Sequence, residues 1–119
     1  MPHVALIPFG PPAADPVVWT PSEVLQGSAE QRAWILYEDA THEFSAGIWE
    51  CDDGKWTVHY TEHEFVHMLC GRIRIVDGAG MEREVGPGDS FVVPAGFVGT
   101  WEVVAPARKY FAIYEKKAD

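Results

Sequence analysis

A short run of imidazole and carboxylate side chains near the middle of the chain offers the first candidate chemistry: His59, Glu62, His63, Glu64 and His67. Imidazole nitrogens and carboxylate oxygens are common ligands of Mn, Fe, Ni and Zn, and a carboxylate can also act as a general acid or base. The surrounding residues predict a β-strand, whose side chains alternate between two faces, so Glu64 and His67 should point in opposite directions. The five side chains therefore cannot all converge on one ion.

The charge of the chain limits its partners. Nine Lys and Arg stand against 18 Asp and Glu in 119 residues, a formal net charge of −9, which disfavours nucleic acid and anionic membrane surfaces. No apolar run approaches the roughly 20 residues of a membrane helix, and the Pro-rich N-terminus does not have the pattern of a signal peptide. Cys51 and Cys70 do not form a CxxC pair. We expect reduced thiols and a cytoplasmic protein.

Strand-like segments separated by turn signals fill the chain from Ala33 onward and predict an all-β sandwich or barrel. The 47% hydrophobic and 13% aromatic fractions are enough for one core. The expected strands lie within residues 34–37, 44–51, 55–60, 65–69, 72–76, 82–85, 91–93, 99–104 and 109–114. Before them, residues 1–32 are predicted to form an extended arm with one helical turn, capped by Thr20 and ended by Gly27.

Two segments rich in glycine and proline carry a resemblance to a known family. The first runs from Gly54 to Gly71, with Glu64 seven residues before its last glycine, and the second runs from Gly86 to Phe97 and contains Pro-Ala-Gly. Their spacing resembles the two motifs of the cupin superfamily. The resemblance implies a cupin double-stranded β-helix, which is a jelly-roll barrel, over residues 33–119.

Three further segments resemble a narrower group, the small single-domain cupins grouped with ureidoglycine aminohydrolase and the ethanolamine-utilisation cupin. These segments are residues 47–50, 96–103 and 108–110. For many members of that group no function is established, so the likeness implies a fold and no reaction.

The resemblance also implies a metal site of three His and one Glu on the inner face of the barrel. In the family motif, three or four residues separate the second His from the Glu. With four residues (the four-residue frame), Thr57 and His59 stand in the first two His positions, and with three residues (the three-residue frame), Val58 and Tyr60 stand there. Glu64 fills the Glu position in both frames. At best two candidate ligands for a divalent Mn, Fe, Ni or Zn ion remain, His59 and Glu64, and in the three-residue frame only Glu64 remains. The set is incomplete, because catalytic sites usually have about three protein ligands.

A small-molecule pocket is the other use of that inner face. Gly99 occupies the third His position of the resemblance and Trp101 shares its strand face, so a glycine would leave space beside an indole wall. Glu64 and Tyr60 are candidate catalytic groups for acid–base chemistry. Together with His59, these four residues make up the predicted ligand pocket.

Three functions remain open from the sequence. The first is a small-molecule-binding cupin, with or without a metal-independent acid–base site, and the second is a metal-dependent cupin enzyme of the aminohydrolase, isomerase or dioxygenase type. The third is a stability or interaction module without a small-molecule ligand. Glu64 is either an unpaired carboxylate that serves a ligand or half of an ion pair with Arg72, Arg74 or Lys109. The apolar N-terminal arm predicts a homodimer.

Overall fold

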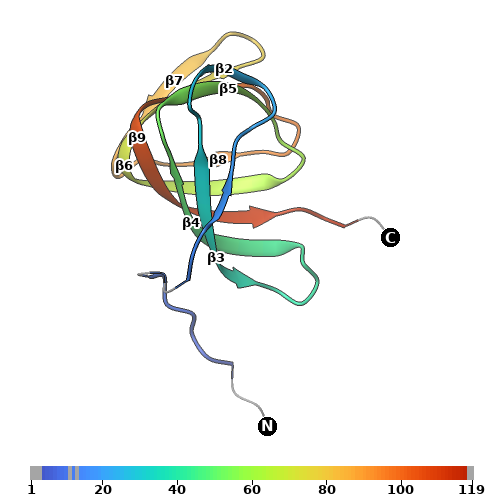
Figure 1. The fold of residues 1–119 in the computed structure, drawn as a ribbon. Helices are drawn as coiled ribbons and strands as arrows, with labels where there is room; N and C mark the ends of the chain where they lie inside the picture. The colour runs from blue at the N-terminus through green and yellow to red at the C-terminus, as the bar shows by residue number, and fades with distance from the viewer. Residues whose placement is uncertain (1–3, 11, 13, 118–119) are drawn as a thin grey trace.

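Nine antiparallel strands form the fold in a computed structural model that describes residues 4–10, 12 and 14–117 (Figure 1). The strands are β1 (Val17–Trp19), β2 (Val24–Gly27), β3 (Gln31–Glu38), β4 (Phe44–Cys51), β5 (Gly54–His59), β6 (His63–Asp77), β7 (Glu82–Val85), β8 (Ser90–Val93) and β9 (Val98–Tyr114). The predicted all-β class is confirmed. The part of the chain that the structure describes contains no helix long and apolar enough to cross a membrane.

The longest strand, β9, holds the sheet together. It pairs with β4, β5 and β6, and the sheet continues from β4 to β3 and β1, and from β5 to β2. Strand β6 also pairs with β7 and β8. Because β9 has β4 and β5 along one side and β6 along the other, the sheet curls around a single interior, as Figure 1 shows. The result is the jelly-roll barrel that the sequence predicts.

Strands β6 and β9 each join two segments that the sequence predicts as separate strands. The β6 register against β9 shifts between Met68 and Ile73, which marks a β-bulge. Gly71 lies inside this bulge with φ +84°, and a Cβ atom there would overlap the backbone of Pro106 and Ala107. The glycine therefore lets two long strands pass in close contact without ending either.

Only the later part of the predicted N-terminal arm joins the sheet, through β1 and β2, whereas the described residues before Val17 form no strand (Figure 1). Strand β1 pairs with β3, and the indole of Trp34 donates a hydrogen bond of 2.9 Å to the carbonyl of Ala14. Where the sequence predicts a helical turn, the structure has a turn at Ser22 and Glu23 followed by β2, so that prediction is wrong. Residues 1–3, 11 and 13 of the arm, and 118–119 of the barrel, lie outside the described residues.

The core fills the barrel with large rings and branched chains. Trp49, Trp56 and Trp101 are buried and contact one another, with ring centroids 6.1–6.5 Å apart. Aliphatic side chains from both halves of β6 and from β9 pack around them, namely Val66, Met68, Ile73 and Val103. Within this apolar interior lie three buried polar side chains, Gln31, Glu64 and Lys109. Buried polar groups need partners, so they indicate where a site lies.

Candidate functional site

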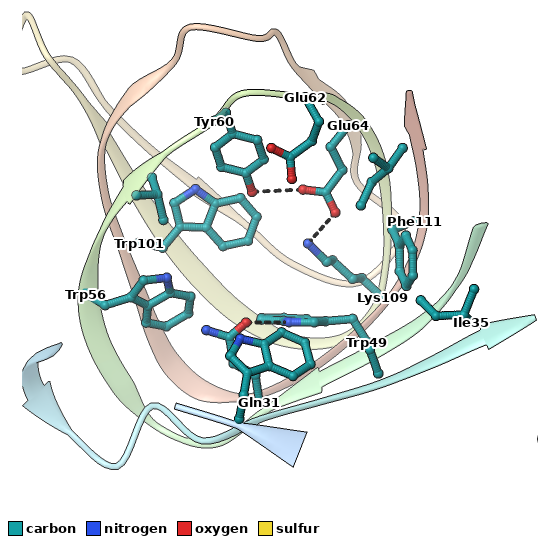
Figure 2. A pocket seen from close by; sticks show the side chains of 14 residues that line it. Gln31, Ile35, Trp49, Trp56, Tyr60, Glu62, Glu64, Trp101, Lys109 and Phe111 are labelled. Atoms are coloured by element: carbon teal, nitrogen blue, oxygen red, sulfur yellow. Dashed lines mark hydrogen bonds and ion pairs between the residues drawn. The ribbon is translucent and has the colours of Figure 1, made fainter. Parts of the chain in front are cut away.

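A cavity of about 210 Å³ opens on the inner face of the barrel (Figure 2). Its wall is mostly aromatic and aliphatic, with a few polar side chains among the rings. The lining residues come from β1, β3, β4, β5, β6, β9 and the β5–β6 turn: Trp19, Gln31, Ala33, Ile35, Trp49, Trp56, Val58, Tyr60, Glu62, Glu64, Trp101, Lys109, Phe111 and Ile113. A concave, largely apolar wall with a few convergent polar groups is typical of small-molecule sites.

Three polar side chains form one hydrogen-bonded chain in the cavity wall. The Tyr60 hydroxyl donates to Glu64 Oε1 at 2.8 Å, and Lys109 Nζ donates to Glu64 Oε2, also at 2.8 Å. Glu64 is 5% exposed and Lys109 is 3% exposed. Both oxygens of the carboxylate are therefore engaged, one by a neutral donor and one by a cation.

Two indole rings complete the surroundings of the Lys109 ammonium group. Its Nζ atom lies 4.4 Å from the ring centroid of Trp49 and 4.6 Å from that of Trp101. Both distances are within the roughly 6 Å over which the negative face of an aromatic ring attracts a cation. The ammonium is thus held by one carboxylate and two π faces, in a region from which most water is excluded.

The barrel strands fix this geometry through their register. Glu64 pairs with Ile113 and Met68 with Lys109, so the two charged residues project from neighbouring strands onto the same inner face. Tyr60 follows β5 and is held by the second glycine motif: Gly96 N donates to the Tyr60 carbonyl at 2.7 Å, and Tyr60 N donates to the Phe97 carbonyl at 2.9 Å.

The electrostatics keep Tyr60 neutral. Burial raises the pKa of the Tyr60 phenol well above its usual range, and the neighbouring negative charge of Glu64 acts in the same direction. The hydroxyl is therefore a hydrogen-bond donor over the whole physiological pH range. In chemical terms these three hydrogen-bonded side chains offer a phenol and an ammonium as donors, joined by a carboxylate that can accept a proton.

Comparison with known proteins places the fold. The family model for the EutQ-like cupin domain matches residues 38–111, well over half of the chain. The chain belongs to the EutQ-like cupin family. No curated protein gives a significant match.

Several solved structures resemble this cupin. A DUF861-family protein of unknown function from Pseudomonas syringae pv. tomato is 22% identical with a TM-score of 0.75, over 85% of this chain and 45% of that one, so this cupin spans less than half of the Pseudomonas protein. A DUF861-family protein from Thermotoga maritima is 26% identical with a TM-score of 0.53, covering 54% and 73% of the two chains. The EutQ protein of Clostridium difficile is 16% identical with a TM-score of 0.63, covering 73% and 64%.

The structure brings together some of the sequence-predicted site residues of this cupin. Tyr60, Glu64 and Trp101 all line the cavity. His59 does not: it is exposed and pairs with Val98 on the outer face of β5. Side chains alternate along β5, and the buried Trp56 places Val58 and Tyr60 on the inner side. Val58 and Tyr60, the two residues of the three-residue frame, are therefore the ones that face the interior.

Gly99 has a different role from the one expected. It pairs with Val58 and so shares the inner phase of Trp101, but a Cβ atom at position 99 would overlap the carbonyl oxygen of Val76. The space beside the indole is taken by the backbone of β6, and Gly99 is not among the lining residues of the cavity. The glycine permits the close approach of two strands instead of opening a pocket.

The residues present do not fit a divalent metal ion. Val58 and Tyr60 occupy the two inner positions where the family resemblance implies His, and both Glu64 oxygens already accept hydrogen bonds. His63 Nδ1 accepts a bond from Ala95 N, and His67 lies near Ser90 outside the cavity. Among the described residues, no three His, Cys, Asp or Glu side chains are grouped closely enough to bind a metal.

Several cavity residues were not predicted from the sequence as parts of the pocket, among them Lys109, Gln31 and Glu62. Lys109 was considered only as one of three ion-pair partners for Glu64, and the structure selects it. One signal was available. In residues 109–113 the side chains of Lys109, Phe111 and Ile113 share a face, so the lysine follows the apolar phase of its strand.

Proposed function

We propose that this cupin binds a small molecule in the aromatic cavity without the help of a metal ion. The observation that carries the proposal is the Glu64–Lys109 ion pair: a protein cation stands beside the carboxylate that the family resemblance assigns to a metal. The Lys109 ammonium supplies a positive charge beside Glu64. Unlike a metal ion, it needs no His ligands at the positions that Val58 and Tyr60 occupy.

The shape and chemistry of the wall support a bound ligand. The indole and aliphatic surfaces offer apolar contact area, while polar groups give direction. Gln31 accepts a 2.8 Å bond from Trp49 Nε1 through its Oε1 atom, which leaves the Nε2 amide to donate to a ligand. The Tyr60 oxygen can accept a further bond while its proton is engaged by Glu64.

An acid–base reaction at the same site is the second candidate function, and the hydrogen-bonded chain favours it. When Glu64 takes a proton from a ligand, its bond from the Tyr60 hydroxyl is released, and that hydroxyl can donate instead to the negative oxygen that develops on the ligand. A hydrolytic or isomerising activity retained in the presence of a chelator would identify this second function.

A thermal-shift screen of a metabolite library, run with a chelator present, tests the binding proposal. A ligand at 100 times its dissociation constant stabilises the native state by about 2.7 kcal/mol. Ile35→Trp should abolish the shift, because Ile35 lines the cavity and is 51% exposed, so a larger ring would obstruct the cavity without entering the core.

Leu25→Trp is the matched control. Leu25 is 55% exposed on β2, at the other end of the strand order from β1, and does not line the cavity, so this variant should keep the full shift. The proposal fails if stabilising compounds act only when a transition metal is added. It also fails if their effect persists unchanged in Ile35→Trp.

A further inference from the structure

We propose that the ligand of this cavity is a small organic cation, an ammonium group carried on a short carbon skeleton. The inference rests on the proposed small-molecule function and goes one step further, to the charge of the ligand. Three features of the cavity support it: its residual charge, the nature of its walls, and the state of its one lysine.

The cavity lining carries one more negative charge than positive charge. Glu64 and Lys109 neutralise each other at 2.8 Å. Glu62 also lines the cavity, and Figure 2 shows its carboxylate directed into the space beside Glu64. Glu62 accepts a bond from the backbone N of Thr61 at 3.1 Å and makes no ion pair with any described residue. A half-buried carboxylate at the edge of an apolar space attracts a cation.

The walls of the cavity are of a kind that binds ammonium groups. The protein itself demonstrates this with Lys109, whose Nζ atom lies over Trp49 and Trp101 at 4.4 and 4.6 Å. Two further indoles, Trp19 and Trp56, line the same cavity and are not used by Lys109. Aromatic faces combined with a carboxylate are the usual means of recognising organic ammonium ligands.

An anionic ligand is disfavoured by the same contacts. Lys109 is the only cation among the described residues that line the cavity, and its charge is already satisfied by Glu64 and two indoles. A carboxylate or phosphate ligand would have to displace Glu64 and approach Glu62. The net charge of −9 on the whole chain also concentrates cations, not anions, near the surface.

The test is a titration of the full chain with choline and with 3,3-dimethyl-1-butanol, which has the same shape and no charge. Binding is followed by tryptophan fluorescence and by calorimetry, with acetate as the anionic probe. We expect choline to bind at least about tenfold more tightly than the neutral alcohol, and acetate not to bind. Glu62→Gln should weaken choline binding by about tenfold.

Glu115→Gln is the control, because it removes the same charge from a residue outside the cavity; choline affinity should change less than about twofold. The inference is overturned if choline and the neutral alcohol bind equally, or if Glu62→Gln leaves the choline affinity unchanged. It is also overturned if choline at about millimolar concentration, in 50-fold excess over the protein, does not bind. If a neutral or anionic compound stabilises the protein and loses its effect in Ile35→Trp, the pocket function stands and only the cation preference fails.

Discussion

Replacing Glu64 by Gln should destabilise the protein strongly, because it leaves the Lys109 ammonium buried without its counter-charge. The two side chains are 6% and 4% exposed, and their charged atoms are 2.8 Å apart. Removing one partner of a buried ion pair costs about 3–5 kcal/mol. The two indole contacts of Lys109 remain in the variant, so we expect a value near the lower end, about 3 kcal/mol.

This free energy converts to a large change in melting temperature. At about 2.1 cal/mol/K per residue, the unfolding entropy of 119 residues is roughly 250 cal/mol/K. A loss of about 3 kcal/mol then lowers the melting temperature by about 12 °C. Thermal unfolding followed by circular dichroism measures it directly. This expectation replaces the one that an unpaired Glu64 would give, in which Gln leaves the melting temperature equal or higher.

A double-mutant cycle isolates the pair. Lys109→Met alone should also destabilise, since it leaves Glu64 charged and buried, whereas Glu64→Gln combined with Lys109→Met removes both charges and keeps an acceptor for Tyr60. The double variant should be more stable than either single variant, by about 2 kcal/mol. Glu84→Gln serves as control, because its pair with Arg72 is exposed and contributes about 0–1 kcal/mol. A melting temperature for Glu64→Gln within about 3 °C of the parent protein would refute the reasoning.

Four further predictions concern metal binding, oligomeric state and the two cysteines. A chelator should leave the melting temperature unchanged, since the residues of the site do not fit a metal, and a fall of many degrees would contradict this. Light scattering should give twice the 13.2 kDa chain mass, because the edge strand β1 exposes Val17 and Val18; the monomer mass at micromolar concentration would contradict it. Burial raises the pKa of the Cys51 thiol from 9.0 to about 12, so a disulfide reagent at pH 8 should modify only the exposed Cys70 in the native protein. For the same reason the free energy of unfolding should fall as the pH rises from about 9 to 12, because the unfolded thiol ionises first; Cys51→Ala should flatten that fall in an alkaline unfolding series.

The fold class could be predicted because its signals are local. Turn residues such as Gly80 and Gly88 have positive φ, and residues that favour such conformations can be recognised in the sequence between the alternating segments. The helical turn was predicted wrongly for a related reason. Thr20 and Pro21 satisfy the local rules for a helix start, but pairing of Val24–Gly27 with β5 outweighs them.

The inner face could be predicted only up to a choice between two frames. Since strand side chains alternate with a period of two, a shift of one residue exchanges every inward side chain for an outward one. The motif allowed either Thr57 and His59 or Val58 and Tyr60, and chemistry favoured the histidine. Burial decides otherwise, because Trp56 packs against Trp49 and Trp101 and so fixes the phase of β5.

The partner of Glu64 depends on a single irregularity in β6. Before the bulge the buried residues of β6 are the even-numbered Glu64, Val66 and Met68, and after it they are Ile73 and Ile75. The bulge around residue 71 therefore reverses the phase of the strand, and an uninterrupted alternation would have turned residues 72 and 74 toward the interior beside Glu64.

The reversal explains why neither arginine of β6 meets Glu64. Arg72 and Arg74 emerge on the outer face, where they pair with Glu84 and Glu102 at 2.6 and 3.0 Å. The interior then contains Glu64 without any cation from its own strand, and the charge comes from Lys109, 45 residues away on β9. Gly71, which permits the bulge through its positive φ, thus determines which cation neutralises Glu64, although it does not line the cavity.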